Sequence, residues 1–249
     1  MAAHSQALRA TRKKGGGPIR ESFAERLFSI ANYVFFILLG AATLFPFLNI
    51  VAKSFSSEAA VVSGIVTLYP IDFQLGTYKW VLGNSQFMNS FKITAFITIV
   101  GTLSSLLLTV LCAYPLSKPD LYGRKPILLL FIFTMLFNGG LIPTYLLMQN
   151  LGMVNTVWSL FVPGMVSVFN MLIIKNYFEG LPESLEESAK LDGATNVRVL
   201  FGIVLPLSMP VLATIGLFYA VMLWNSYFNA MVYITAPELK PLQLYLKEL

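Results

Sequence analysis

Residues 126–174 read PILLLFIFTMLFNGGLIPTYLLMQNLGMVNTVWSLFVPGMVSVFNMLII, and no charged side chain interrupts these 49 positions. A helix needs about 20 mainly apolar residues to cross the hydrocarbon core of a bilayer, so this run is long enough for two crossings. Polar residues and a glycine, from Gln149 to Asn155, lie inside the run and predict a turn. The run therefore predicts two membrane spans, at residues 127–148 and 156–174.

Three further charge-free runs predict three more spans. They indicate crossings at residues 27–52, 92–116 and 202–223, and a polar, aromatic stretch starts at Trp224. Only 12% of the chain is charged and the mean hydropathy is +0.71, which excludes an ordinary soluble domain. We expect an all-α integral membrane protein with five spans.

The distribution of lysine and arginine predicts the orientation of these spans. Basic residues are enriched in cytoplasmic loops, and the N-terminal tail holds six of the 17 in this chain. With the tail inside, twelve basic residues lie inside and five outside. We expect residues 1–26 to form a flexible, basic cytoplasmic tail, and residues 27–249 to form one transmembrane domain. The first apolar run is longer than the 7–15 residues of a signal peptide, so we interpret it as an uncleaved anchor.

A row of small residues runs along the predicted second span, with Gly101, Ser105, Thr109 and Ala113 spaced by four. Small residues let membrane helices approach closely. The row is consistent with packing inside one bundle or with a second membrane subunit.

Helix-breaking residues interrupt several spans. Pro46, the Asn138–Gly140 turn with Pro143, Pro163, and the pair Pro206 and Pro210 all lie inside apolar runs. Such breaks indicate either simple kinks or a transport pathway, where freed backbone groups meet water or protein.

The predicted inner loop at residues 175–198 is rich in charge, and we expect a helix, a turn and a second helix there. Pro182 suits a first helical turn, Leu181, Leu185 and Ala189 form an apolar stripe, and Glu186 and Lys190 form an i,i+4 pair. Asp192 and Gly193 break the helix, and Asp192 is expected to cap a second helix that starts near Ala194. Such a hairpin is suited either to a groove in another protein or to the bilayer surface.

Residues 186–210, EESAKLDGATNVRVLFGIVLPLSMP, resemble the EAA loop of ABC importer permeases, EAAxxDGAxxxxxFxxIxLPxxxP. Two positions depart, because Ser188 replaces the usual alanine and Leu200 the usual phenylalanine. The matching residues are Glu187, Ala189, Asp192, Gly193, Ala194, Ile203, Leu205, Pro206 and Pro210. The stretches DFQLGTYKWVL and FNGGLIPTYLLMQNLGMVNTVWSL look like the branch that imports oligosaccharides.

The resemblance implies the type I importer helix bundle, and it implies partners. The partners are a second homologous permease, two copies of a cytoplasmic ATPase and an external solute-binding protein. The resemblance also places the chain in the cytoplasmic membrane, with its N-terminus inside. Related permeases have six spans, and residues 238–249 look like the loop before the last one. The sixth span is therefore expected to be missing from this sequence.

The resemblance also assigns roles within the EAA loop, residues 179–206. Glu187 and Asp192 would anchor the loop to the ATPase, and Gly193 would permit the turn. The other residues assigned to ATPase coupling, through close approach or entry into the span, are Ala189, Ala194, Leu205 and Pro206.

No motif of a catalytic site occurs in the chain. It lacks GxxxxGK[ST] and HExxH, and its one histidine, His4, lies in the basic tail. We therefore expect a transport subunit without catalytic, metal or cofactor residues, whose ATP and Mg²⁺ are bound by the partner ATPase. The alternatives are an ABC permease for a non-sugar solute, a secondary transporter, which should show charges inside its spans, and a membrane scaffold.

Overall fold

The computed structural model describes residues 22–249. The chain divides into two compact units, and the boundary between them in the sequence follows Trp80. Most of the predicted basic tail, residues 1–21, lies outside the described residues. Helix α2 (Phe23–Ser54) begins four residues before the predicted span. Ser22 and Glu25 form a capping box at its start, in which Glu25 Oε2 accepts the backbone N–H of Ser22 at 2.7 Å.

The first unit consists of α2 and a folded segment that follows it. Helix α2 continues through Pro46, and Ala52 is its only buried residue. The segment contains α3 (Glu58–Val62) and the start of α4 (Gly76–Gly83). Asn49 Nδ2 donates to the carbonyl oxygens of Val66 and Thr67, at 3.1 and 2.7 Å, and so holds the segment against the end of α2.

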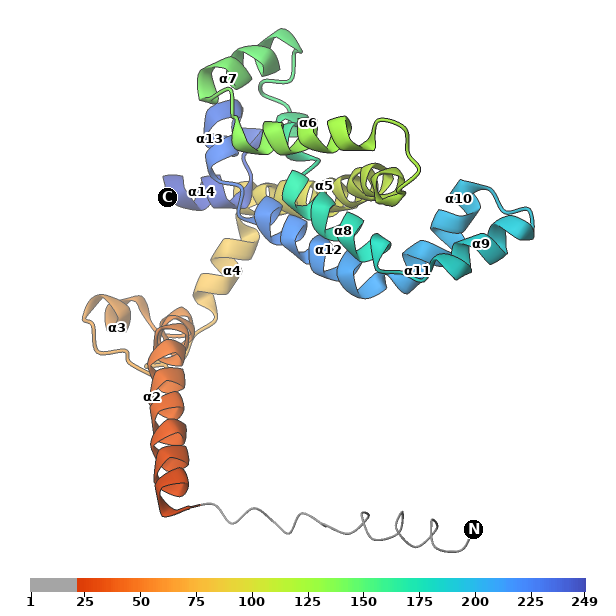
Figure 1. Ribbon diagram of the computed structural model, residues 1–249. Helices are drawn as coiled ribbons and strands as arrows, with labels where there is room; N and C mark the ends of the chain where they lie inside the picture. The colour runs from red at the N-terminus through yellow and green to blue at the C-terminus, as the bar shows by residue number, and fades with distance from the viewer. Residues whose placement is uncertain (1–21) are drawn as a thin grey trace, which may run out of the picture. The chain divides into compact units, whose positions relative to one another are not determined.

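The second unit is built around α5 (Ser85–Ser117), which packs against α8 (Val168–Glu179) and α12 (Met209–Trp224) (Figure 1). By length and composition, α2 and α5 can each cross a membrane. Three pairs of shorter elements also qualify if each bent pair counts as one span, which gives up to five crossings.

The bent pairs break where the sequence carries its helix breakers. Helices α6 (Arg124–Leu136) and α7 (Leu141–Asn150) meet at 111°, and Gly140 between them has a φ of 92°. The 3₁₀ turns η1 (Val157–Leu160) and η2 (Val162–Gly164) meet α8 at 50°. The segment Asn196–Leu207 meets α12 at 84°, with the break at Ser208, between Pro206 and Pro210.

The row of small residues on α5 packs inside this unit. All four residues are buried, and a Cβ added to Gly101 would lie 2.7 Å from Leu223 Cδ1 on α12. Thr109 Oγ1 lies 2.7 Å from Tyr219 Oη, which accepts the backbone N–H of Ser167 at 3.0 Å. The structure therefore favours packing within one bundle, the first of the two interpretations of this row.

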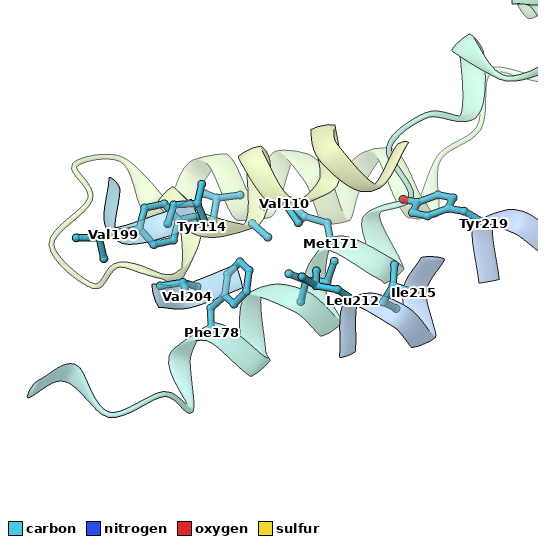
Figure 2. Close-up of a cluster of buried hydrophobic side chains, with 13 residues drawn as sticks. Val110, Tyr114, Met171, Phe178, Val199, Val204, Leu212, Ile215 and Tyr219 are labelled. Carbon is cyan, nitrogen blue, oxygen red and sulfur yellow. The ribbon is translucent and has the colours of Figure 1, made fainter. Parts of the chain in front are cut away.

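The main core lies among α5, α8 and the chain from Val199 to Tyr219 (Figure 2). Its largest fully buried side chains include Met171, Ile174, Ile215 and Tyr219. Beyond α12, the chain forms α13 (Phe228–Tyr233), the turn η4 (Pro237–Leu239) and α14 (Leu242–Glu248). Thr94 Oγ1 ties this end to α5, because it accepts the backbone N–H of Leu242 at 2.7 Å.

Candidate functional site

The acidic hairpin, residues 179–206, lies at one end of the second unit, opposite α13 and α14 (Figure 1). Its first helix, α9 (Glu183–Leu191), begins directly after Pro182 and carries Glu183 and Glu186 in its first turn. Negative charge there stabilises the helix, because the first N–H groups of a helix carry partial positive charge. The predicted helix is therefore present, with the proline at its boundary.

The turn after α9 has the hydrogen bonds of a Schellman motif. Gly193 N–H donates to Lys190 O at 3.0 Å, and Ala194 N–H donates to Ala189 O at 2.9 Å. Gly193 has a φ of 81°, and a Cβ placed on it would meet no atom within 4 Å. Glycine is thus required by the backbone conformation of this turn and not by crowding.

Ala189 and Ala194 lie where this turn meets the core. Both are partly buried and pack against the core cluster, as does Leu181. Leu185, in contrast, is 42% exposed. The predicted apolar stripe therefore turns mainly toward this chain's own bundle. The spacing of these residues predicted a buried face, but it did not determine whether residues of the same chain or of a partner would bury it.

The second helix of the hairpin differs in detail from the prediction. α10 (Asn196–Val199) is capped by Thr195, whose Oγ1 accepts the N–H of Arg198 at 3.4 Å, so Asp192 is not its cap. Asp192 instead ends α9. A residue three positions before a backbone N–H can cap it, and Thr195 has that spacing to Arg198 whereas Asp192 does not.

From α10 the chain enters the last bent span through a wide turn. Residues Leu200–Val204 form a π-helical segment, followed by the short helix α11 (Leu205–Leu207). Leu205 packs against the core, while Pro206 is exposed and supplies no backbone N–H to the turn before it. The two residues therefore anchor and shape the point where the hairpin joins the span.

The outward face of the hairpin combines exposed acidic and apolar side chains. Glu187 and Asp192, to which the resemblance assigns contact with the ATPase, are both exposed. Leu191 and Val197 are 89% and 66% exposed. The sequence pattern did not mark these two residues as functional, because neither belongs to the apolar stripe. Only the position of Leu191 directly before the helix break sets it apart. Single exposed apolar side chains are common on protein surfaces, so this exposure leaves both residues accessible to a partner without requiring one.

Glu186 pairs with a residue from another part of the chain. Its carboxylate forms an ion pair with Lys118, the residue that caps the C-terminus of α5, and not the predicted pair with Lys190. The Glu186 side chain is only 12% exposed, and Tyr114 Oη donates to it at 3.5 Å. The bundle thus supplies a closer and less solvated partner than the exposed face of α9 does.

Glu179, where the hairpin begins, forms two ion pairs. One joins it to Arg124 at the start of α6, and the other joins it to Lys175 Nζ at 2.8 Å. Sequence analysis placed Lys175 in a loop, whereas the structure places it within α8, with its side chain 11% exposed. Helix α8 therefore extends past the charge-free run, and the charges in its last turns are paired.

A cavity of about 910 Å³ lies between the hairpin and the loop that joins α5 to α6. Charged groups of both signs from the two segments line it, among them Lys118, Asp120, Arg124 and Glu183. Within residues 22–249 no group of three His, Cys, Asp or Glu side chains is arranged to hold a metal ion. The charged lining of both signs is suited to polar contacts with a protein.

Comparison with known proteins identifies relatives across most of the chain. Residues 121–239 match the family "binding-protein-dependent transport system inner membrane component". Protein LplC of Bacillus subtilis is 45% identical, over 90% of this chain and 76% of the relative. The polygalacturonan/rhamnogalacturonan transport system permease protein YtcP, also of Bacillus subtilis, is 41% identical, over 90% of this chain and 78% of the relative.

A solved structure has the same fold. It is a bacterial ABC transporter involved in the import of the acidic polysaccharide alginate. One of its chains is 39% identical to this chain, and the two superpose with a TM-score of 0.88. The match covers 92% of this chain and 81% of that chain. The prediction of the helical importer fold is confirmed by this match. With relatives this similar over most of their length, the chain belongs to the inner membrane permease components of binding-protein-dependent ABC transport systems, alongside permeases of the carbohydrate-uptake branch.

Proposed function

We propose that this permease passes an oligosaccharide across the cytoplasmic membrane, driven by a separate ATPase that docks on the acidic hairpin. The observation that carries the proposal is the two-sided construction of the hairpin. Ala189 and Ala194 pack against the bundle, while Leu191 and Asp192 face outward. A helix held on one face and open on the other can transmit a force applied by a partner.

The physical basis of coupling is differential binding. ATP shifts the transporter between two conformations only to the extent that the ATPases bind it better in one of them. In this proposal, two ATPase copies close around ATP and Mg²⁺ and move the hairpins of this chain and of a second permease. The bundle then alternates between inward and outward openings.

The substrate class is supported by the relatives. Permeases named for galactooligosaccharide and arabinooligosaccharide transport are 30% and 26% identical to this chain. The alginate importer and the polygalacturonan permease are more similar. We therefore propose an oligosaccharide delivered by an external solute-binding protein, with the N-terminus and the acidic hairpin of this chain on the cytoplasmic side.

The docking proposal is tested by photo-cross-linking in the purified complex. Leu191→Cys, labelled with a photoreactive maleimide, should cross-link to an ATPase subunit, because the side chain is 89% exposed. Leu181→Cys is the control, since it lies in the same hairpin on the face that packs against the core and has no assigned contact with the ATPase. Equal labelling of both positions, or accessibility of Leu191→Cys only from outside the cell, would refute the docking site.

The transport proposal is tested separately, in proteoliposomes that contain the whole complex and the binding protein. Labelled oligosaccharides should accumulate only when ATP is present on the cytoplasmic side. Accumulation without ATP would refute the ATP-driven mechanism. Import of another solute class with no response to oligosaccharides would refute the substrate assignment.

A further inference from the structure

Two ion pairs join the acidic hairpin to the loop between α5 and α6. From their geometry we infer that Lys118 and Arg124 are positioning residues that carry displacement of the hairpin to α5 and α6. This inference rests on the proposed function. It adds the route by which movement of the hairpin reaches α5 and α6, which are not adjacent to the hairpin in the sequence.

The need for such a route follows from the order of the elements. The hairpin continues directly into α8 on one side and α12 on the other, so both helices are pulled through the backbone. Helices α5 and α6 precede it and have no backbone connection to either of its ends. They can follow only through side chains that contact the hairpin or the core.

The first connection centres on Glu186, in the first turn of α9. Its carboxylate pairs with Lys118, and the two side chains are 12% and 30% exposed. The Lys118 ammonium also lies 4.7 Å from the centroid of the Tyr114 ring. Ion pairs that are partly removed from water are screened less than exposed pairs, so this contact resists separation more than a surface ion pair does.

The second connection centres on Arg124 at the first residue of α6. Its Nε donates to the backbone oxygen of Leu116 near the end of α5, at 2.8 Å, and its Nη2 donates to Glu179. Glu179 ends α8 and begins the hairpin. One planar guanidinium thus joins α5, α6 and α8, which a lysine with its single ammonium group could not do in the same geometry.

Together the two connections hold the hairpin at its first residue, Glu179, and in the first turn of its first helix. They also form walls of the 910 Å³ cavity between the two segments. A rigid movement of α9 therefore pulls on Lys118 and Arg124, and through them on the cytoplasmic ends of α5 and α6. Loss of either connection would free the nearby ends of α5 and α6 from the hairpin, while the rest of α5 stays packed against α8 and α12.

The experiment measures solute imported per ATP hydrolysed by the reconstituted complex. Lys118→Glu and Glu186→Lys, each alone, should lower this ratio about fivefold or more, the lower range of coupling between linked sites. The double variant restores the ion pair with its charges exchanged and should recover most of the ratio. Lys125→Glu is the control, because Lys125 follows Arg124 in α6, is exposed, and has no ion pair among the described residues.

Arg124 is tested by a conservative change that leaves the charge in place. Arg124→Lys should lower the ratio although the ATPase still co-purifies, since the link to Leu116 and Glu179 together requires the guanidinium. An unchanged ratio in the single variants, or a double variant no better than either single one, would overturn the inference. A wild-type complex without ATP-driven import would overturn the proposed function as well, and these two failures are distinguishable.

Discussion

Replacement of Gly193 by valine is predicted to uncouple ATP hydrolysis from transport. Gly193 has a φ of 81°, which costs a residue with a Cβ about 1–2 kcal/mol, and a β-branched residue more. A Cβ there meets no atom within 4 Å, so steric crowding adds nothing and the cost lies in the backbone alone. A strain of about 1–2 kcal/mol shifts a two-state equilibrium by a factor of about 5–30.

The strain is released when the two hydrogen bonds that end α9 break, from Gly193 N–H to Lys190 O and from Ala194 N–H to Ala189 O. Helix α9 then loses its fixed angle to the core. We expect ATP hydrolysis by the reconstituted complex to continue while uptake per ATP falls. Membrane insertion should be normal, because the apolar spans are unchanged.

Two variants isolate the backbone effect. Gly193→Asn should retain most of the coupling, because asparagine tolerates the left-handed region better than other residues with a Cβ. Gly202→Ala lies in the same hairpin, where φ is not positive and a Cβ has open space, so it should leave coupling unchanged. Normal uptake per ATP in Gly193→Val, or an equal loss in Gly193→Asn, would refute the reasoning.

Two further predictions concern packing around α5. Gly101→Ala should destabilise the purified protein by about 1–3 kcal/mol, because its Cβ would lie 2.7 Å from Leu223 Cδ1 and 3.2 Å from Phe161 Cβ, and both side chains are buried with little room to shift. Gly216→Ala, whose nearest neighbour lies at 3.8 Å, should be tolerated in the same thermal unfolding assay. Tyr219→Phe should cost about 1–3 kcal/mol, because it leaves the backbone N–H of Ser167 without its acceptor. Equal melting temperatures for the two alanine variants, or an unchanged melting temperature for Tyr219→Phe, would contradict these expectations.

The membrane class and the position of the acidic hairpin could be predicted from the sequence because both depend on local patterns. A bilayer excludes charge over a fixed thickness, so the charge-free runs mark where helices lie whatever they pack against. Gly193 is equally local, since the turn after α9 requires a left-handed backbone that glycine adopts most readily. The breakers at Gly140 and Pro206 also predicted breaks, although not the bends of 111° and 84°.

Tertiary structure alone decided which groups meet. Helical spacing favours Lys190 as the partner of Glu186, yet Lys118 forms the ion pair from 68 positions earlier in the chain. The same spacing identifies an apolar face at Leu181 and Ala189, but only the folded chain shows that its own core covers that face and that Leu191 faces solvent. A periodic pattern determines which residues share a face, whereas the partner of that face depends on where distant segments of the chain come together.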